Sequence, residues 1–232
     1  MTNLIDPREN IIAERFKDVK KIFLVSGFKG GIGKSLISSS LSLAMNDLGF
    51  KTGLLDMDIT SSTDHIILGV KDKFPEEKNG ILPVEIYGIK FMSFYFFTMS
   101  KPFALRGNDI KDAVKELLCV TVWDKLDCLI IDMPPGFSDA ALELMRLINN
   151  FKVILVRTPS PLSIDIVSRM SGIYKDKGFK TIIVNNMSKD TTMGNSIRYD
   201  TSIDDAIGNV TAIKKTQFYR DVLSLSSDMI KA

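Results

Sequence analysis

Short apolar runs alternate along the chain with longer stretches in which apolar residues follow a helical spacing. The runs cover residues 21–27, 52–58, 127–133, 152–157 and 180–186. They are rich in Ile, Leu and Val, which is typical of strands that are covered on both faces. The stretches between them predict helices over residues 34–48, 108–122, 138–149 and 161–176. This alternation predicts an α/β fold with a doubly wound, mostly parallel sheet.

Two segments depart from the alternation. Residues 80–97 hold two short β-type runs on either side of Tyr87-Gly88, which predicts a hairpin or a bent strand. Residues 1–20 are rich in charge and carry apolar residues along one side, which predicts a helical arm. We therefore expect an N-terminal arm over residues 1–20 and one domain over residues 21–232.

The composition is that of a globular protein, and the charge narrows the function classes. Hydrophobic residues make up 45% and charged residues 25% of the 232 residues. With 30 Lys and Arg against 28 Asp and Glu, the formal net charge is +2. This balance excludes a nucleic-acid coat protein and a polybasic membrane anchor as expectations.

The cysteine content and the N-terminus predict a cytoplasmic location. Cys119 and Cys128 are too few for a disulfide framework, so we expect a reducing compartment. The N-terminus lacks the apolar core of a secretory signal, and no apolar run approaches the roughly 20 residues that span a bilayer. We therefore expect neither secretion nor a transmembrane segment.

The strongest motif is a glycine-rich stretch, GFKGGIGKS at residues 27–35, between the first apolar run and the first expected helix. Glycines let successive backbone N–H groups turn toward one point, where the N-terminus of the helix adds its partial positive charge. Lys34 is placed to reach the β- and γ-phosphates of a nucleotide, and the Ser35 hydroxyl to ligate Mg²⁺. Phe28 stands where a strict Walker A motif has Gly, and Lys29 is a second lysine. The alternative is a glycine-rich turn with solvated lysines.

Acidic residues follow at the ends of two expected strands. Asp56 and Asp58 end one run, and strand alternation places them on the same face. Asp132 ends another and has the form of a Walker B carboxylate, with Gly136 in the following turn placed to approach a γ-phosphate through its N–H. We expect Ser35, Asp56 and Asp132 to hold Mg²⁺ directly or through water. The alternative is that the carboxylates cap strand–loop junctions.

The stretch KGGIGKS resembles the deviant Walker A motif of the MinD/ParA/Mrp group of P-loop ATPases. The resemblance implies a P-loop ATPase domain over residues 21–232 that sandwiches ATP in a homodimer. It implies that Lys29 contacts the phosphates bound by the partner subunit and acts with Lys34 and Asp58 in catalysis. Leu36 replaces a second hydroxyl residue, so only its backbone N–H is left for the α-phosphate. The implied nucleotide contacts are Lys29, Gly30, Gly31, Ile32, Gly33, Lys34, Ser35, Leu36, Gly136 and Asn186.

The resemblance is closer to the Mrp/ApbC-type branch than to MinD or ParA. It implies that Asp58 positions the hydrolytic water and that Asn186 contacts adenine. The alternative interpretation is that Asn186 is a turn residue at the end of a strand. No guanine-binding NKxD motif occurs, which favours ATP over GTP. The shared blocks, in the order of the family, are residues 56–59, Leu68-Gly69, Arg106-Gly107, Trp123, Leu126-Asp127, residues 131–136 with Asp139, Thr158-Pro159 and Asn186-Met187-Ser188.

Two features depart from that branch. Ser61-Ser62-Thr63 replace the usual small-Pro-Ser stretch in the first switch loop. Residues 188–194 hold no cysteine where the iron–sulfur carriers of the Mrp type have a CxxC pair. Cys119 and Cys128 have apolar neighbours and no metal-site spacing, so we expect core residues and no iron–sulfur cluster on the chain's own cysteines.

The resemblance predicts slow, Mg²⁺-dependent ATP hydrolysis by a homodimer that acts as a nucleotide-driven switch. The first hypothesis for its role is iron–sulfur or metal cofactor assembly of the Mrp type, beside a protein partner that carries cysteines. The alternatives are a MinD/ParA-type positioning or partition ATPase that binds a membrane surface or DNA, and a regulatory ATP-binding module.

Three further features have two interpretations each. His65 is expected to be a surface-loop histidine rather than a ligand or base. The C-terminal helix, with apolar residues from Phe218 to Ile230, is expected to pack on the core rather than on a membrane. The aromatic run at residues 91–97 is expected to be sheet-edge core rather than a docking surface.

Overall fold

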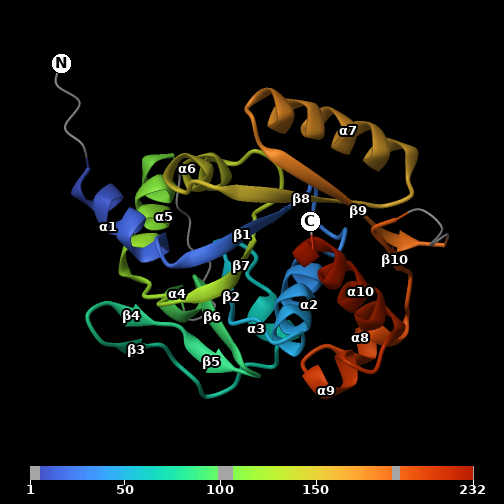
Figure 1. The fold of residues 1–232 in the computed structure, drawn as a ribbon, viewed down its shortest axis with the longest axis horizontal. Coiled ribbons are helices and arrows are strands. Elements are labelled where there is room, and N and C mark those ends of the chain that lie inside the picture. The colour runs from blue at the N-terminus through green and yellow to red at the C-terminus, as the bar shows by residue number, and fades with distance from the viewer. Residues whose placement is uncertain (1–5, 99–106, 190–193, 232) are drawn as a thin grey trace.

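The computed structural model describes residues 6–98, 107–189 and 194–231 (Figure 1). Residues 1–5 of the expected arm, Arg106, and residues 190–193 of the stretch without cysteine lie outside the described residues. The strands are β1 (Val19–Ser26), β2 (Thr52–Asp56), β3 (Glu76–Glu77), β4 (Ile81–Leu82), β5 (Val84–Ile86), β6 (Ile89–Ser93), β7 (Leu126–Asp132), β8 (Phe151–Arg157), β9 (Lys180–Ser188) and β10 (Ser196–Arg198). The helices are α1 (Pro7–Phe16), α2 (Lys34–Asp47), α3 (Asp64–Ile67), α4 (Tyr95–Thr98), α5 (Asn108–Val120), α6 (Asp139–Leu147), α7 (Pro161–Asp176), α8 (Ser202–Ala206), α9 (Val210–Ile213) and α10 (Gln217–Lys231).

The main sheet has eight strands in the order β10-β9-β8-β1-β7-β2-β6-β5. All neighbours are parallel except the edge pair of β5 and β6. The chain leaves β1 toward β2 on one side and later returns to β8 on the other. The strand order therefore reverses beside β1, and open α/β sheets bind ligands at such a point. The predicted doubly wound, mostly parallel α/β fold is confirmed.

Helices cover both faces of this sheet. Figure 1 shows α5, α6 and α7 on one face and α2 and α10 on the other. Right-handed crossovers explain the division. The connection from β1 to β2 runs toward the β5 edge of the sheet, whereas the connections from β6 to β7, from β7 to β8 and from β8 to β9 run toward the β10 edge. The central strands β1, β2, β7 and β8 are mostly buried, as their Ile, Leu and Val content predicted, whereas β9 is mostly half-buried.

The hairpin predicted around Tyr87-Gly88 is confirmed. β5 pairs antiparallel with β6, and both turn residues have positive φ, 50° at Tyr87 and 82° at Gly88. Two consecutive residues of this conformation match the twist of the flanking strands. Of the aromatic run, Phe91, Phe94 and Phe96 are buried, as expected for core at the sheet edge, whereas Phe97 is 47% exposed.

The C-terminal helix α10 packs on the core, as predicted. Phe218, Val222, Leu225 and Met229 are all at most 4% exposed, so the apolar side of the helix faces the protein. The partner element is α2, against which α10 lies in Figure 1. In the described part of the chain, every helix is too short or too polar to cross a bilayer.

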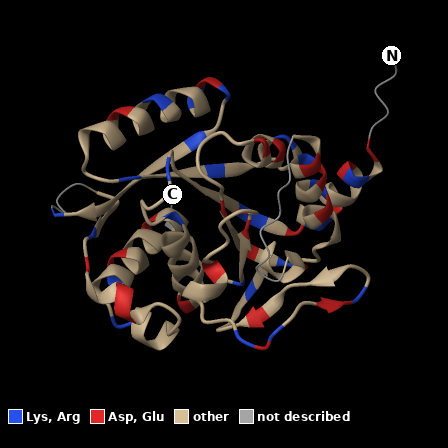
Figure 2. Ribbon diagram, turned by 180° about the vertical axis from the view of Figure 1, so that it is seen from behind, with Lys and Arg blue, Asp and Glu red and all other residues tan. Residues whose placement is uncertain are grey.

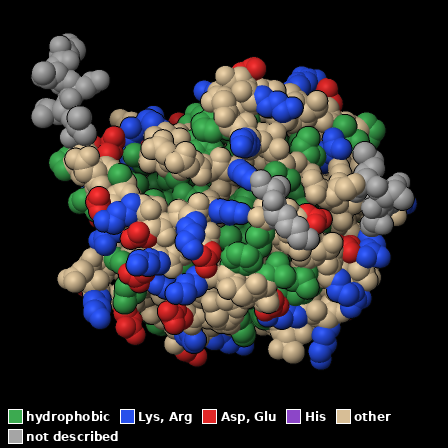
Figure 3. Space-filling model, in the orientation of Figure 1, with side chains coloured by type: hydrophobic (Ala, Val, Ile, Leu, Met, Phe, Trp, Pro, Cys, Tyr) green, Lys and Arg blue, Asp and Glu red, His purple; other side chains and the backbone are tan. Residues whose placement is uncertain are grey.

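Basic and acidic side chains are interspersed over the surface. In Figure 2 both signs of charge occur on most helices, and in Figure 3 blue and red side chains adjoin across the face shown. This distribution follows the near balance of 30 basic and 28 acidic residues.

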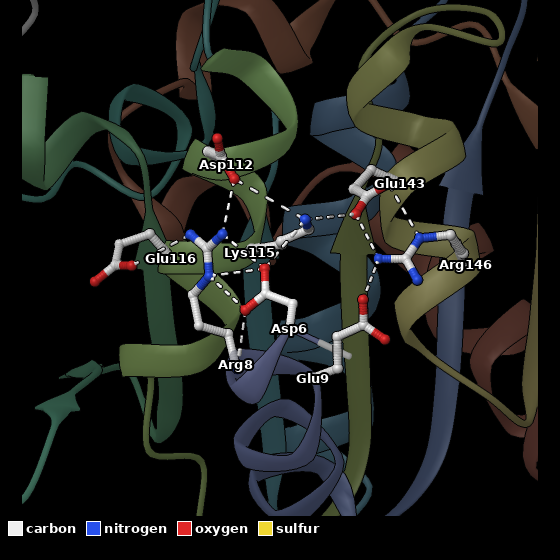
Figure 4. A network of polar contacts seen from close by, with 8 residues as sticks. All are labelled: Asp6, Arg8, Glu9, Asp112, Lys115, Glu116, Glu143 and Arg146. Carbon is white, nitrogen blue, oxygen red and sulfur yellow. Dashed lines mark hydrogen bonds and ion pairs between the residues drawn. The ribbon is translucent and has the colours of Figure 1, made fainter. Parts of the chain in front are cut away.

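The helix α1 is attached to α5 and α6 by both apolar and charged contacts. Ile12 and Phe16 are buried in the common core. Arg8 donates to Asp6 at 2.7 Å and to Asp112 of α5 at 2.8 Å, and Arg146 of α6 donates to Glu9 at 2.8 Å. The division into an arm and a domain stays a prediction. The whole network, shown in Figure 4, comprises Asp6, Arg8, Glu9, Asp112, Lys115, Glu116, Glu143 and Arg146.

Truncating the apolar anchor of α1 tests whether this helix folds as part of the domain. Ile12 is 1% exposed and the adjacent Ile11 is 43% exposed, so the two positions form a matched pair. We expect Ile12→Ala to lower the free energy of unfolding by about 3 kcal/mol, because it leaves a cavity. Ile11→Ala should change it by less than about 0.5 kcal/mol. Urea unfolding measures both values, and equal small losses would show that α1 detaches from the core.

Candidate functional site

The glycine-rich loop connects the end of β1 to the start of α2. Gly31 and Gly33 have φ of 76° and 85°, a conformation that L side chains rarely adopt. Asn186 from β9 holds the loop in place, since its Nδ2 donates to the Ile32 carbonyl at 2.8 Å. A Cβ at Gly33 would collide with this amide. The loop shape therefore requires glycine at residue 33.

The N-terminus of α2 presents the groups expected of a phosphate site. Lys34 is the first residue of the helix and is 8% exposed, whereas Lys29 in the loop is exposed. Within the described part of the chain, no side chain caps this helix, so its first N–H groups are available to an anion. Leu36 packs partly against the core, and only its backbone can serve a nucleotide.

Asp56 and Asp132 lie side by side at the carboxyl ends of β2 and β7. They are register partners in the parallel pair, and Val25 at the end of β1 pairs with Asp132 on the other side. Asp132 accepts hydrogen bonds from Ser35 Oγ at 2.6 Å and Ser38 Oγ at 2.8 Å. The structure thus brings together Ser35, Asp56 and Asp132, the three residues predicted to hold Mg²⁺.

Asp64 is an acidic residue of this site that the sequence analysis missed. It begins the short helix α3, is 0% exposed, and accepts a hydrogen bond from Ser39 Oγ of α2 at 2.6 Å. One carboxylate oxygen each of Asp56, Asp64 and Asp132 lie within 4.8 Å of one another. The signal in the sequence was the serine run on α2, because buried hydroxyls at Ser38 and Ser39 need acceptors.

Burial and mutual repulsion disfavour the ionised forms of these three groups. Burial, and next the Asp132 charge, raises the pKa of Asp56 to about 7. Burial raises the pKa of Asp132 to about 6, against the opposing effects of Ser35, Ser38 and the Lys34 charge. Burial and the two neighbours raise the pKa of Asp64 well above its ordinary value. Two charges 4.8 Å apart repel by about 3 kcal/mol at an effective dielectric constant near 20, so the cluster favours a proton or a cation.

Asp58 lies outside this cluster, and the strand-alternation argument for it was wrong. β2 ends at Asp56, so Asp58 stands in the following loop. Its Oδ1 accepts hydrogen bonds from the N–H groups of Thr60 at 3.1 Å and Ser61 at 2.9 Å. The carboxylate is half-buried and orders the first switch loop in this way.

Gly136 connects the loop after β7 to the glycine-rich loop. Its φ is 71°, and its N–H donates to the Gly27 carbonyl at 2.9 Å. Its approach to a γ-phosphate stays a prediction, and that approach requires this hydrogen bond to open. The contact of Asn186 with adenine also stays a prediction.

His65 is not a surface-loop residue, as was expected, but part of α3. Its ring stacks on Tyr95 with 3.7 Å between centroids and 11° between planes, and burial lowers its pKa. Its Nδ1 lies 3.5 Å from Ser62 Oγ, which also donates to Asp56. The switch-loop serine is thereby tied to the carboxylate cluster. Ser93, the last residue of β6 and two residues before Tyr95, donates through its Oγ to Asp56 Oδ2 at 3.1 Å.

The two cysteines do not join a group of metal-ligating side chains in the described residues. Cys128 on β7 is 1% exposed and Cys119 on α5 is half-buried, and both are free thiols. Burial raises the pKa of Cys128 to about 11 and also raises that of Cys119, which keeps both thiols protonated.

The fold and the glycine-rich loop define a P-loop NTPase. The profile of the family described as "ParA: NUBPL iron-transfer P-loop NTPase" matches residues 18–221. The chain therefore belongs to this family.

Curated relatives match about three quarters of the chain. An iron-sulfur cluster carrier protein of Aquifex aeolicus is 31% identical over 73% of this chain, and one of Rickettsia felis is 35% identical over 74%. The iron-sulfur cluster transfer protein NUBPL of Dictyostelium discoideum is 32% identical over 73%. These matches cover 48%, 55% and 54% of the relatives, so the chain spans about half the length of the curated relatives it matches.

Solved structures show the same fold. A nucleotide-binding protein of Archaeoglobus fulgidus in complex with ADP has a TM-score of 0.73 at 23% identity, over 89% of this chain and 93% of that one. The septum site-determining protein MinD of Pyrococcus horikoshii, complexed with Mg-ADP, has a TM-score of 0.67 at 18% identity, over 91% and 96%.

Proposed function

We propose that the chain binds ATP with Mg²⁺ and hydrolyses it slowly as a homodimer, with ATP acting as a conformational switch. The observation that carries this proposal is the alignment of Lys34 and Ser35 at the open N-terminus of α2 with Asp132, which lies 2.6 Å from Ser35 Oγ. Family membership supports it. The loop backbone from Gly30 to Gly33 and the first N–H groups of α2 would surround the phosphates.

The donor set fits Mg²⁺. The hydroxyl of Ser35 and the carboxylates of Asp56 and Asp132 are oxygen donors, which this hard cation prefers. When bound, Mg²⁺ would neutralise charge on the β- and γ-phosphates. Lys34 holds the phosphate oxygens, and Asp58, in the loop that follows β2, orients the attacking water.

A conservative substitution separates the two roles of Asp58. Asp58→Asn keeps an Oδ1 acceptor for Thr60 and Ser61 but removes the charge. We expect it to bind ATP as the parent does and to lower the single-turnover hydrolysis rate at least 100-fold. Asp58→Ala should lower the hydrolysis rate as much, and it should also destabilise the first switch loop because it removes the acceptor for Thr60 and Ser61. If Asp58→Asn binds ATP weakly, or hydrolyses it at the parental rate, Asp58 has a structural role only.

The exposed Lys29 supports a role across a dimer interface. Within its own loop, Lys34 already occupies the phosphate position, whereas Lys29 faces solvent. A lysine supplied by the partner subunit would stabilise negative charge on the transferred phosphoryl group.

Dimerisation driven by ATP tests this role. We expect light scattering to show dimers of the parent with ATP and monomers with ADP. Lys29→Ala should weaken ATP-dependent association and turnover at least tenfold while ADP binding is retained, because ADP lacks the γ-phosphate. Lys177→Ala, at another exposed lysine, is the matched control, and Lys34→Ala should lose nucleotide binding altogether. A Lys29→Ala protein that dimerises and hydrolyses normally would leave Lys29 as a solvated loop residue.

The cellular role that best fits the chain is iron–sulfur or metal cofactor assembly in the cytoplasm. The family description and the names of the relatives support this role. The buried Cys128 and half-buried Cys119 are poor cluster ligands, so a partner protein would supply the cysteines. The burial of the apolar side of α10 argues against the alternative of a membrane-positioning ATPase.

Capture of the partner in the ATP state tests the assembly role. Asp58→Asn protein, purified anaerobically with ATP, should retain a partner together with iron and acid-labile sulfide, because hydrolysis no longer releases it. Lys34→Ala should retain neither, since it lacks the nucleotide. Co-sedimentation with DNA or with anionic vesicles in ATP is the counter-test. Sedimentation with either, without iron in the captured material, would favour the positioning or partition alternative.

A further inference from the structure

The carboxylate cluster contains one more acidic group than the nucleotide site uses. Asp56 and Asp132 are assigned to Mg²⁺ through their place beside Ser35, whereas Asp64 belongs to α3 and is hydrogen-bonded by Ser39 of α2. All three side chains are at most 1% exposed. A third buried carboxylate adds repulsion to a pair that already repels, so its presence calls for a compensating group.

Among the described residues, the hydrogen bonds to this cluster come from neutral donors, and the one positive charge that acts on Asp132 is that of Lys34, against three carboxylates. Asp56 accepts hydrogen bonds from the hydroxyls of Ser62 and Ser93 and from the backbone N–H of Asp58. Asp132 accepts from two hydroxyls of α2, and Asp64 accepts from a third, that of Ser39. Hydroxyl and amide groups satisfy lone pairs but do not balance charge.

One carboxylate oxygen of Asp64 also lacks a hydrogen-bond partner among the described residues. Asp64 Oδ1 accepts from Ser39, but Oδ2 is buried without a hydrogen-bond partner among the residues that the structure describes. A buried carboxylate oxygen in this state is costly unless a ligand completes it. This oxygen without a partner is an observation independent of the crowding of the acidic groups, and it too indicates a positively charged ligand.

The dimensions suit a hard divalent cation. The three ligand oxygens lie within 4.8 Å of one another. Opposite oxygen ligands of a cation with bonds of 2.3–2.6 Å stand about 5 Å apart, and those of Mg²⁺ about 4 Å apart. A cation of Ca²⁺ or Mn²⁺ size therefore fits with small movements, and the all-oxygen donor set disfavours soft metals.

We propose that Asp56, Asp64 and Asp132 bind one hard divalent cation in the nucleotide-free protein, with Asp64 as the third carboxylate ligand. The site requires no phosphate oxygen, which distinguishes it from the Mg²⁺ that accompanies ATP in the proposed function. It would place a cation behind the phosphate loop before a nucleotide arrives and hold α3 against α2.

Manganese binding in the absence of nucleotide tests the proposal. Nucleotide-free, EDTA-treated protein is titrated with MnCl₂ at pH 7.5, and free Mn²⁺ is followed by its electron paramagnetic resonance signal. We expect one Mn²⁺ per chain, displaced by Mg²⁺ or Ca²⁺, and a Mn²⁺ dissociation constant at least tenfold weaker in Asp64→Asn. Asp228→Asn, the same substitution at an exposed position of α10, should bind as the parent does.

Two controls separate this site from the nucleotide site. Lys34→Ala should keep Mn²⁺ binding, because it removes a phosphate ligand and no carboxylate. Asp64→Asn should keep metal-free ADP binding, which also reports that the variant is folded. The parent protein alone can overturn the proposal. If it binds ADP but no Mn²⁺, and if Mg²⁺ alone does not raise its melting temperature, protons rather than a cation neutralise the cluster. This outcome does not depend on whether the variants fold. Equal Mn²⁺ binding by Asp64→Asn and the parent would likewise overturn the proposal.

Discussion

The Asp132 carboxylate is the point on which the site depends, because it joins the sheet to the first helix. Its backbone is held between β1 and β2 by parallel pairing, so its position is set by the two central strands. Its two oxygens accept hydrogen bonds from Ser35 and Ser38 on successive turns of α2. Charge-assisted bonds of this kind are stronger than neutral ones. They determine where α2 begins, and therefore where the phosphate loop must close.

The fold class and the phosphate site could be predicted from the sequence because local patterns determine them. Buried parallel strands need continuous apolar runs and the loop needs glycines, so local patterns indicated the fold class and the phosphate site. Asp64 was missed because α3 has only four residues, too few for a periodic pattern, and its partner Ser39 lies 25 residues earlier. Asp58 was misplaced because a strand end cannot be located to within two residues from composition. Contacts between distant segments carried the missing information.

Asn186 shows how such a long-range contact constrains the local motif. Its amide reaches the Ile32 carbonyl across 154 residues of sequence, and the Gly33 backbone packs against it. The glycine pattern of the loop is thus partly a requirement of β9, not only of a phosphate ligand. Since Asn186 is 3% exposed, a change at this strand end would alter the phosphate loop directly.

The two loops expected to sense the nucleotide are attached to the site by individual hydrogen bonds. The loop after β7 is tied to the phosphate loop through the Gly136 N–H and the Gly27 carbonyl, and the first switch loop is tied to Asp56 through Ser62. A hydrogen bond of the first kind contributes about 1 kcal/mol net. Binding of a nucleotide at 100 times its dissociation constant contributes about 2.7 kcal/mol. A ligand that replaces the Gly136 contact with a phosphate oxygen can therefore move this loop without disturbing the sheet that supports it.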